Sequence, residues 1–215
     1  MRKSLAGAIG YFNEQCGAEV LSHLLTDGDA AVSQAARASL EMLARPGMEP
    51  PRPGETYSSS EWAALLRELS EFRLTDPELA ARLSDPVLRG NWRGNWLGEP
   101  GATAPEIIAL ERRIGQALPP SYRSFLAESD GFLSPDIFIP ALHGTKEADW
   151  FGVRHAEWAQ AYRDTYPHLG SYLQVSSAGD GAVVLLNPNV KASDGEWQTC
   201  FFANWIPGAR VHASF

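Results

Sequence analysis

The feature that most constrains this chain is the stretch from residue 98 to residue 131, which predicts two short helices and a corner between them. Thr103 precedes an apolar periodicity as a possible N-cap. The pair Pro119-Pro120 interrupts that periodicity, and Asp130-Gly131 follows the second helix as a turn signal. The inward positions expected on the two helices are Ile107, Leu110, Ile114, Tyr122, Phe125 and Leu126.

After this unit the pattern changes from helices to strands. Apolar runs at 172–176 and 182–186 flank a Gly-Asp-Gly turn at 179–181, which is typical of a hairpin. A turn is expected at 187–189 and another strand at 196–203. Two short strands and an amphipathic helix are expected at 137–139, 151–153 and 155–163. Helices followed by a meander of strands indicate an α+β fold, with helices packed on an antiparallel sheet.

The first 85 residues predict a helical segment that is packed on or linked to the sheet. Residues 24–40 are similar to one HEAT-type helical repeat, and only one such unit is visible. Four prolines and two glycines at 45–54 indicate a linker. Helices are expected after the capping sequence 58–61 and again from Thr75 to about residue 85. The predicted domains are therefore residues 1–85 and 86–215.

The charge of the chain limits its partners. Its 215 residues carry a formal net charge of −8, which argues against non-specific nucleic-acid binding, because that requires a basic face. An acidic surface attracts a basic protein partner, although solubility alone explains the same charge. No stretch approaches the roughly 18 apolar residues of a membrane span. Cys16 and Cys200 fit reduced thiols, so we expect a soluble cytoplasmic protein.

No catalytic or metal-binding pattern stands out in the sequence. The nearest of the five histidines, His143 and His155, are too far apart in sequence for a close metal-ligand pair. The Gly-Asp-Gly sequence at 179–181 lacks the further acidic ligands that calcium needs, and Cys200 lies inside an aromatic strand. We therefore expect neither a metal nor a cofactor, and no enzymatic activity.

Tryptophan is abundant, with seven in the chain, and core packing is expected for Trp96 and Trp205. Three other tryptophans each follow a carboxylate directly, in the pairs Asp149-Trp150, Glu157-Trp158 and Glu196-Trp197. A carboxylate beside an indole suits recognition of a basic protein surface. A half-buried strand or helix edge explains the same pairs equally well, and the sequence does not choose between these interpretations.

Several short motifs occur together in a characteristic order from about residue 92 to residue 215. They are Trp96-Leu-Gly, Leu118-Pro-Pro-Ser-Tyr-Arg-Ser-Phe-Leu126, Ser129-Asp-Gly131, Val184-Leu-Leu-Asn-Pro188, Gly195-Glu-Trp197, Phe202-Ala-Asn-Trp205, Pro207-Gly208 and Ala213-Ser-Phe215. In this order they resemble the SUKH superfamily, the Smi/Knr-type domain. The resemblance implies a SUKH-like antiparallel sheet with flanking helices.

The resemblance also implies non-enzymatic protein binding. Many bacterial members are understood as immunity proteins that neutralise toxins, so a basic toxin domain is the expected partner. An intracellular scaffold or regulatory protein without a toxin partner is the alternative, and the oligomeric state is left open. We expect the binding surface on the sheet and on the loops at 136–150 and 180–197. The candidate binding residues are Asp136, Asp149, Trp150, Glu157, Trp158, Asp180, Glu196 and Trp197.

Overall fold

The computed structural model describes residues 57–84, 94–136, 138–204 and 209–215, together with isolated residues between 22 and 37. The chain forms two compact units, Met1–Pro50 and Pro51–Phe215. In the first unit, the described residues at 32–34 and 36–37 are helical, with Val32 and Ala36 buried. The linker at 45–54, Trp92, Trp205 and part of the HEAT-like unit lie outside the described residues. All elements below belong to the second unit.

The two helices expected between residues 98 and 131 are confirmed. Helix α7 spans Ala104–Ile114 and helix α8 spans Pro120–Glu128. Thr103 forms a capping box with Glu106 at the start of α7, and Gly115 ends it in the left-handed conformation at φ 78°. The Pro119-Pro120 corner starts α8, whose buried side includes Tyr122, Phe125 and Leu126.

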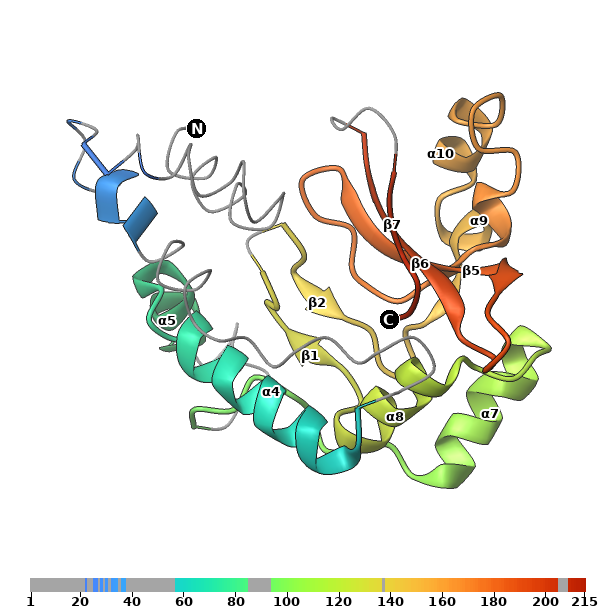
Figure 1. Cartoon of the computed structure of the whole chain (residues 1–215), viewed down its shortest axis with the longest axis horizontal. Helices are drawn as coiled ribbons and strands as arrows, with labels where there is room; N and C mark the ends of the chain where they lie inside the picture. The colour runs from blue at the N-terminus through green and yellow to red at the C-terminus, as the bar shows by residue number, and fades with distance from the viewer. Residues whose placement is uncertain are drawn as a thin grey trace. The chain divides into compact units, whose positions relative to one another are not determined.

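A five-stranded antiparallel sheet forms the centre of the domain (Figure 1), in the order β3-β4-β5-β6-β7. Its strands are Asp149–Trp150, Leu173–Gln174, Ala182–Lys191, Trp197–Ala203 and Arg210–His212, respectively. The expected hairpin is confirmed, because Leu173 pairs with Leu186 across β4 and β5. Strands β1 (Phe132–Leu133) and β2 (Ala141–Leu142) form a separate pair, which a bridge between Leu142 and Ser176 connects to the region after β4.

Both faces of the large sheet are covered, because its strands alternate apolar residues between two cores. On one face Leu186 and Trp197 pack with residues of α7 and α8. On the other face Val183, Leu185 and Phe202 pack with helix α9 (Phe151–Arg154) and the 3-10 helix η1 (Leu169–Ser171). Figure 1 shows α9 and the following helix α10 (Ala156–Ala161) on the opposite side of the sheet from α7 and α8.

Three local expectations were wrong. In the strand expected at 137–139, the described residues Phe138 and Ile139 belong to no strand, because their N–H groups donate to the Asp136 side chain in a turn. Residues 151–153 form the start of α9 rather than a strand. The strand in this region is only Asp149–Trp150, and the side chain of Phe151 is buried at the first position of the helix. The turn expected at 187–189 lies inside β5, where the register shifts between Asn187 and Lys191. A bulge of this kind accommodates Pro188, which has no N–H to donate to a sheet ladder.

Two helices that precede the α7–α8 unit also belong to this domain. Helix α4 (Ser59–Arg73) begins with the expected cap, a capping box between Ser58 and Glu61, and α5 (Pro77–Ser84) follows it. Trp62 of α4 is buried against Phe125 of α8 and against Phe215, with ring centroids 5.6 Å and 5.9 Å apart. Buried aromatic pairs of this type stabilise by about 0.5–1.5 kcal/mol beyond their area. Helix α4 is therefore packed directly on α8.

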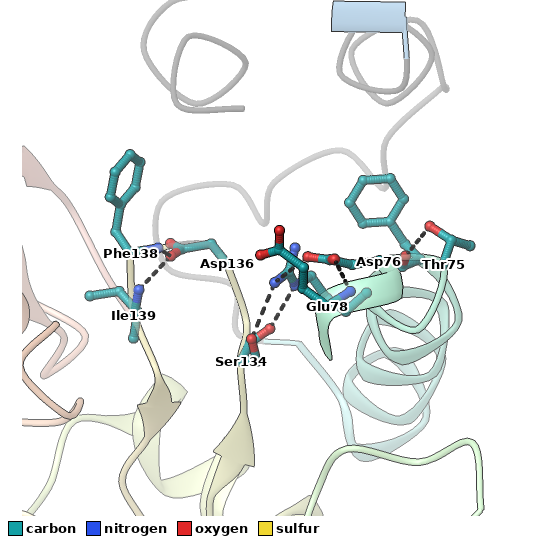
Figure 2. A network of polar contacts seen from close by, with 9 residues as sticks. Thr75, Asp76, Glu78, Ser134, Asp136, Phe138 and Ile139 are labelled. Atoms are coloured by element: carbon teal, nitrogen blue, oxygen red, sulfur yellow. Dashed lines mark hydrogen bonds and ion pairs between the residues drawn. The ribbon is translucent and has the colours of Figure 1, made fainter. Parts of the chain in front are cut away.

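A buried arginine makes a second attachment between α4 and the rest of the domain. Arg73 donates from Nε to the Ser134 carbonyl at 2.9 Å and from Nη2 to Ser134 Oγ at 3.2 Å. Its guanidinium also lies 3.8 Å from Asp76. Figure 2 shows Ser134, the first residue of the loop between β1 and β2, facing the α4–α5 turn. A buried guanidinium is stable only when its N–H groups have hydrogen-bond acceptors. Because Ser134 supplies such acceptors, this contact fixes the α4–α5 turn against the β1–β2 loop.

We expect Trp62→Ala to lower the free energy of unfolding by about 3–5 kcal/mol, because it leaves a large cavity between α4, α8 and Phe215. Urea denaturation of the full chain measures this change. The control is Ile108→Ala on α7, since Ile108 is 38% exposed and its truncation should cost less than about 1 kcal/mol. Equal losses for the two variants would contradict the packing of α4 on α8.

Candidate functional site

One continuous segment presents exposed apolar and charged side chains together. It comprises residues 147–158, which run through β3, α9 and the start of α10, and is called the 147–158 surface below. Val153 is 70% exposed, the highest value among the large hydrophobic residues that the structure describes. Glu147, Arg154 and Glu157 are also exposed in this segment, and Asp149 is half-buried. The segment therefore combines three carboxylates, one guanidinium and one exposed apolar side chain.

Buried aromatic residues hold this segment against the sheet. Phe151 is fully buried in the core on that face, and its N–H donates to the Tyr172 carbonyl at 2.8 Å. Trp158 is half-buried, with its ring centroid 6.1 Å from that of Phe151 and 6.4 Å from that of Phe202. Trp158 is thus a partly exposed aromatic residue on a fixed support, the arrangement typical of a binding anchor.

The remaining acidic and aromatic residues of this segment have local roles as well. Asp149 Oδ1 accepts a hydrogen bond from the Trp150 N–H at 2.8 Å. Trp150 is half-buried, packs against the core beneath α7 and α8, and occupies the N-cap position of α9. Arg154 donates to the Glu147 carbonyl, which ties the end of α9 back to the residues before β3. Trp150 and Trp158 thus pack against the two opposite cores of the sheet, although both belong to the same segment.

Asp136 and Asp180 lie in a different place. Asp136 Oδ1 accepts from the backbone N–H groups of Phe138 and Ile139, each at 2.6 Å, and so closes a turn (Figure 2). Burial raises the pKa of Asp136, while these bonds and Arg73 act in the opposite direction. Asp180 is exposed in the β4–β5 turn, where it adopts a positive φ of 45°. Gly179 in the same turn packs on the Phe138 carbonyl, which places this turn beside the loop of Asp136.

A titratable side chain lies beneath the 147–158 surface. His143 is 5% exposed, and its Nε2 lies 3.4 Å from Ser177 Oγ. Burial, followed by the positive charge of Arg154, lowers the pKa of His143 to about 4. The same two causes lower the pKa of the neighbouring His155, whose ring lies between Phe151 and Trp158. Both imidazoles are therefore neutral at physiological pH.

The region from α7 to the last residue has a recognisable sequence. Residues 101–215 match the SMI1 / KNR4 family (SUKH-1). The chain belongs to this family. The match confirms the resemblance to the SUKH superfamily. No curated protein matches the sequence.

The family match includes the whole 147–158 surface, whereas α4 and α5 precede it. This SUKH-1 family is known for immunity proteins and for binding protein partners in general. Family membership therefore indicates the class of function to test. The location of a binding surface has to be argued from the residues of this chain.

The expectation of an exposed Glu196 and Trp197 has to be corrected. Glu196 is 4% exposed, and its carboxylate accepts from the Ser121 N–H at 2.7 Å and from Ser121 Oγ at 2.6 Å. Trp197 is 1% exposed and packs in the core beneath α7 and α8. Glu196, the residue before β6, thus caps the N-terminus of α8. Burial raises the pKa of its carboxyl group, while the two hydrogen bonds from Ser121 and the helix N-terminus favour the charged form. In this SUKH-1 domain both residues are structural.

A signal for this role existed in the sequence. Helix α8 begins at Pro119-Pro120, and neither proline offers a side-chain oxygen to cap the free N–H groups of the first turn. An external acceptor was therefore needed. The exposed residues Glu147 and Val153 were missed for another reason, since no motif marks them. Glu147 lies in a turn before β3, and Val153 lies in α9.

The described residues contain no group of three potential metal-ligating side chains. Burial raises the pKa of the Cys200 thiol to about 12, so this cysteine is a poor nucleophile. Within the described part of the chain, no helix combines the length and apolar character needed to cross a bilayer.

We expect Glu196→Gln to lower the free energy of unfolding by about 1–3 kcal/mol, because it removes a charge-assisted acceptor from the Ser121 donors. Glu157→Gln, the matched change at an exposed position, should alter it by less than about 0.5 kcal/mol. Thermal or urea unfolding compares the two variants. An unaffected stability in Glu196→Gln would show that the buried carboxylate does not support α8.

Proposed function

We propose that this chain is a non-enzymatic, immunity-type protein that binds a cognate bacterial toxin directly and neutralises it. Membership in the SMI1 / KNR4 family supports the class of function. The observation that carries the choice of surface is the 70% exposure of Val153 among the carboxylates of Glu147, Asp149 and Glu157. In this proposal the 147–158 surface contacts a basic face of the toxin.

Charge supports the choice of a basic partner. The chain has a net charge of −8. The 147–158 surface is acidic as well, because it carries three carboxylates and only one guanidinium, that of Arg154. Complementary charge accelerates encounter and excludes wrong partners, while apolar and aromatic anchors supply most of the binding energy. Val153 and the exposed part of Trp158 fit the role of anchors, and Glu147 and Glu157 fit that of the charged rim.

The support beneath the segment favours binding with little rearrangement. Phe151 is buried, and the ring of Trp158 contacts Phe151 and Phe202, so the exposed side chains project from a packed layer. A surface that is ordered before binding loses less conformational entropy when the complex forms. Asp136 and Asp180 remain outside this proposed surface, because their turns lie elsewhere in the domain.

We expect Val153→Asp to weaken binding of the cognate toxin domain by at least about tenfold. The reason is that it places a charge where a desolvated apolar contact is needed. Val190→Asp is the matched control, since Val190 is 48% exposed at the end of β5 and outside the surface. Titration calorimetry with purified proteins measures both affinities. Equal affinities of the two variants would exclude this surface.

We also expect the double variant Glu147→Lys/Glu157→Lys to slow association with the same toxin domain by at least about fivefold, with the effect shrinking at high salt. Glu71→Lys/Glu99→Lys changes the net charge equally at exposed positions outside the surface. Stopped-flow association at low and high salt separates local from overall charge. If both double variants slow association equally, only the overall charge matters. If wild type captures no toxin domain but captures regulatory proteins, the scaffold alternative replaces the proposal.

A further inference from the structure

The two edges of the five-stranded sheet differ in how their outward backbone groups are bonded. The edges are β3 and β7, each of which pairs with one neighbouring strand. At the β3 edge, Asp149 Oδ1 accepts from the Trp150 N–H at 2.8 Å. The Ala148 carbonyl accepts from Arg113 at 2.7 Å, and the Ala148 N–H donates to the Gly144 carbonyl at 3.1 Å. Side chains and a turn therefore occupy this edge, which is a common way of preventing strand addition.

The bonding of β5 shows in which direction the backbone groups of each strand point. Val184 accepts from the Val175 N–H at 3.0 Å, and its own N–H donates to Ser176 Oγ at 2.8 Å. Both of its backbone groups therefore point toward the β4 side. Successive residues of an antiparallel strand alternate in direction, so the next residue, Leu185, points toward β6, where it pairs with Cys200.

The same alternation, carried across β6, determines the direction at β7. Since Cys200 points toward β5, its neighbour Phe201 points toward β7 and pairs with Arg210. Val211 lies opposite Cys200 in the register, so its N–H and carbonyl point away from the sheet. Within the described part of the chain, neither group has a hydrogen-bond partner. The β7 edge thus presents one donor and one acceptor, spaced as a further strand requires.

The side chains around this position also fit an added strand. Val211 is 55% exposed, and it shares the face of Cys200, because directly opposite residues of a pair lie on one face. The N–H of Ala209 points outward as well, but it donates to the Tyr166 hydroxyl at 2.8 Å. Tyr166 therefore closes the edge on one side of Val211, and it lies beside Phe202 with a ring separation of 5.7 Å. The open part of the edge is centred on Val211.

The charge around β7 differs from that of the chain as a whole. The chain has a net charge of −8, yet residues 197–215 contain no aspartate or glutamate. Within β7, Arg210 and His212 flank Val211, and the alternation places their side chains on the face opposite to it. This edge is therefore complementary to a segment that carries carboxylates, whereas the 147–158 surface suits a basic partner.

We propose that β7 is a second docking edge, to which an extended acidic segment of a partner protein adds as an antiparallel strand. An apolar residue of that segment lies opposite Val211 and exchanges both backbone hydrogen bonds with it. Carboxylates on either side of the apolar residue lie opposite Arg210 and His212, on the other face. Main-chain bonds supply the affinity and these alternate side chains the specificity. Because β3 and β7 are opposite edges of the sheet, this interaction goes beyond toxin binding and does not depend on it.

The test uses the isotope-labelled full chain and a peptide with blocked ends, Thr-Thr-Thr-Glu-Val-Glu-Thr-Thr-Thr. NMR spectroscopy follows the backbone amides during a titration with this peptide. We expect saturable shifts of the β7 amides and at least about fivefold slower solvent exchange of the Val211 amide, with the amides of β3 unchanged. No saturable change at β7, or equal changes at β3 and β7, would overturn the proposal.

Two matched peptides separate main-chain pairing from charge. N-methylation of the peptide valine removes its N–H donor without changing the charge, and it should weaken binding by at least about tenfold. Replacement of both glutamates by lysine should weaken binding by at least about fivefold. Equal affinity of the N-methylated peptide would exclude strand addition, and equal affinity of the lysine peptide would exclude an acidic partner.

A variant of the chain tests the same bond from the other side. Val211→Pro removes only an outward N–H, which proline tolerates at an edge strand, and it should weaken binding of the Glu-Val-Glu peptide by at least about tenfold. Val211→Ile keeps the N–H and should bind like wild type. Equal binding by both variants would overturn the proposal, and the N-methylated peptide gives the same information if Val211→Pro does not fold. Protection of the Val211 amide that rises with protein concentration alone would assign the edge to a second copy of the chain and overturn the acidic partner.

Discussion

Trp62 packs edge-on against Phe125 and beside Phe215, and this aromatic contact joins three segments that are far apart in the sequence. Around it, Ser59 Oγ donates to Glu128 and Ser124 Oγ donates to the Tyr57 carbonyl, so polar bonds fix the same interface. Phe215 also donates its N–H to Ser121 Oγ, and the Ser121 hydroxyl in turn donates to the buried carboxylate of Glu196. One aromatic cluster therefore connects α4, α8, β6 and the residues after β7.

This arrangement gives the two sides of the sheet different roles. On the α8 side, α4 already covers the aromatic residues, which leaves that layer occupied within the chain itself. On the other side, α9 and α10 are held by Phe151 and Trp158, with Val153 exposed beyond them. The side that remains accessible carries the acidic residues proposed for partner binding.

Sequence patterns predicted the parts of the fold that depend on local rules. Capping residues at Ser58 and Thr103 and the Pro119-Pro120 corner define helices α4, α7 and α8, and the family resemblance was confirmed over residues 101–215. Exposure was harder to predict, because a carboxylate beside a tryptophan occurs both at a surface and in a core. Glu196-Trp197 and Glu157-Trp158 share that pattern, yet the first pair is buried and the second is at least partly exposed. Only long-range pairing, Glu196 with Ser121 in this case, distinguishes them.

The central claim is that a partner binds the α9–α10 side of this domain. The most direct measurement is the hydrogen-exchange footprint of the cognate toxin domain on the full chain at neutral pH. The account predicts protection of residues 147–161 in the complex, with the amides of α4 and α5 unchanged. Protection confined to residues 57–84, or to the β4–β5 turn that carries Asp180, with residues 147–161 unaffected, would contradict it.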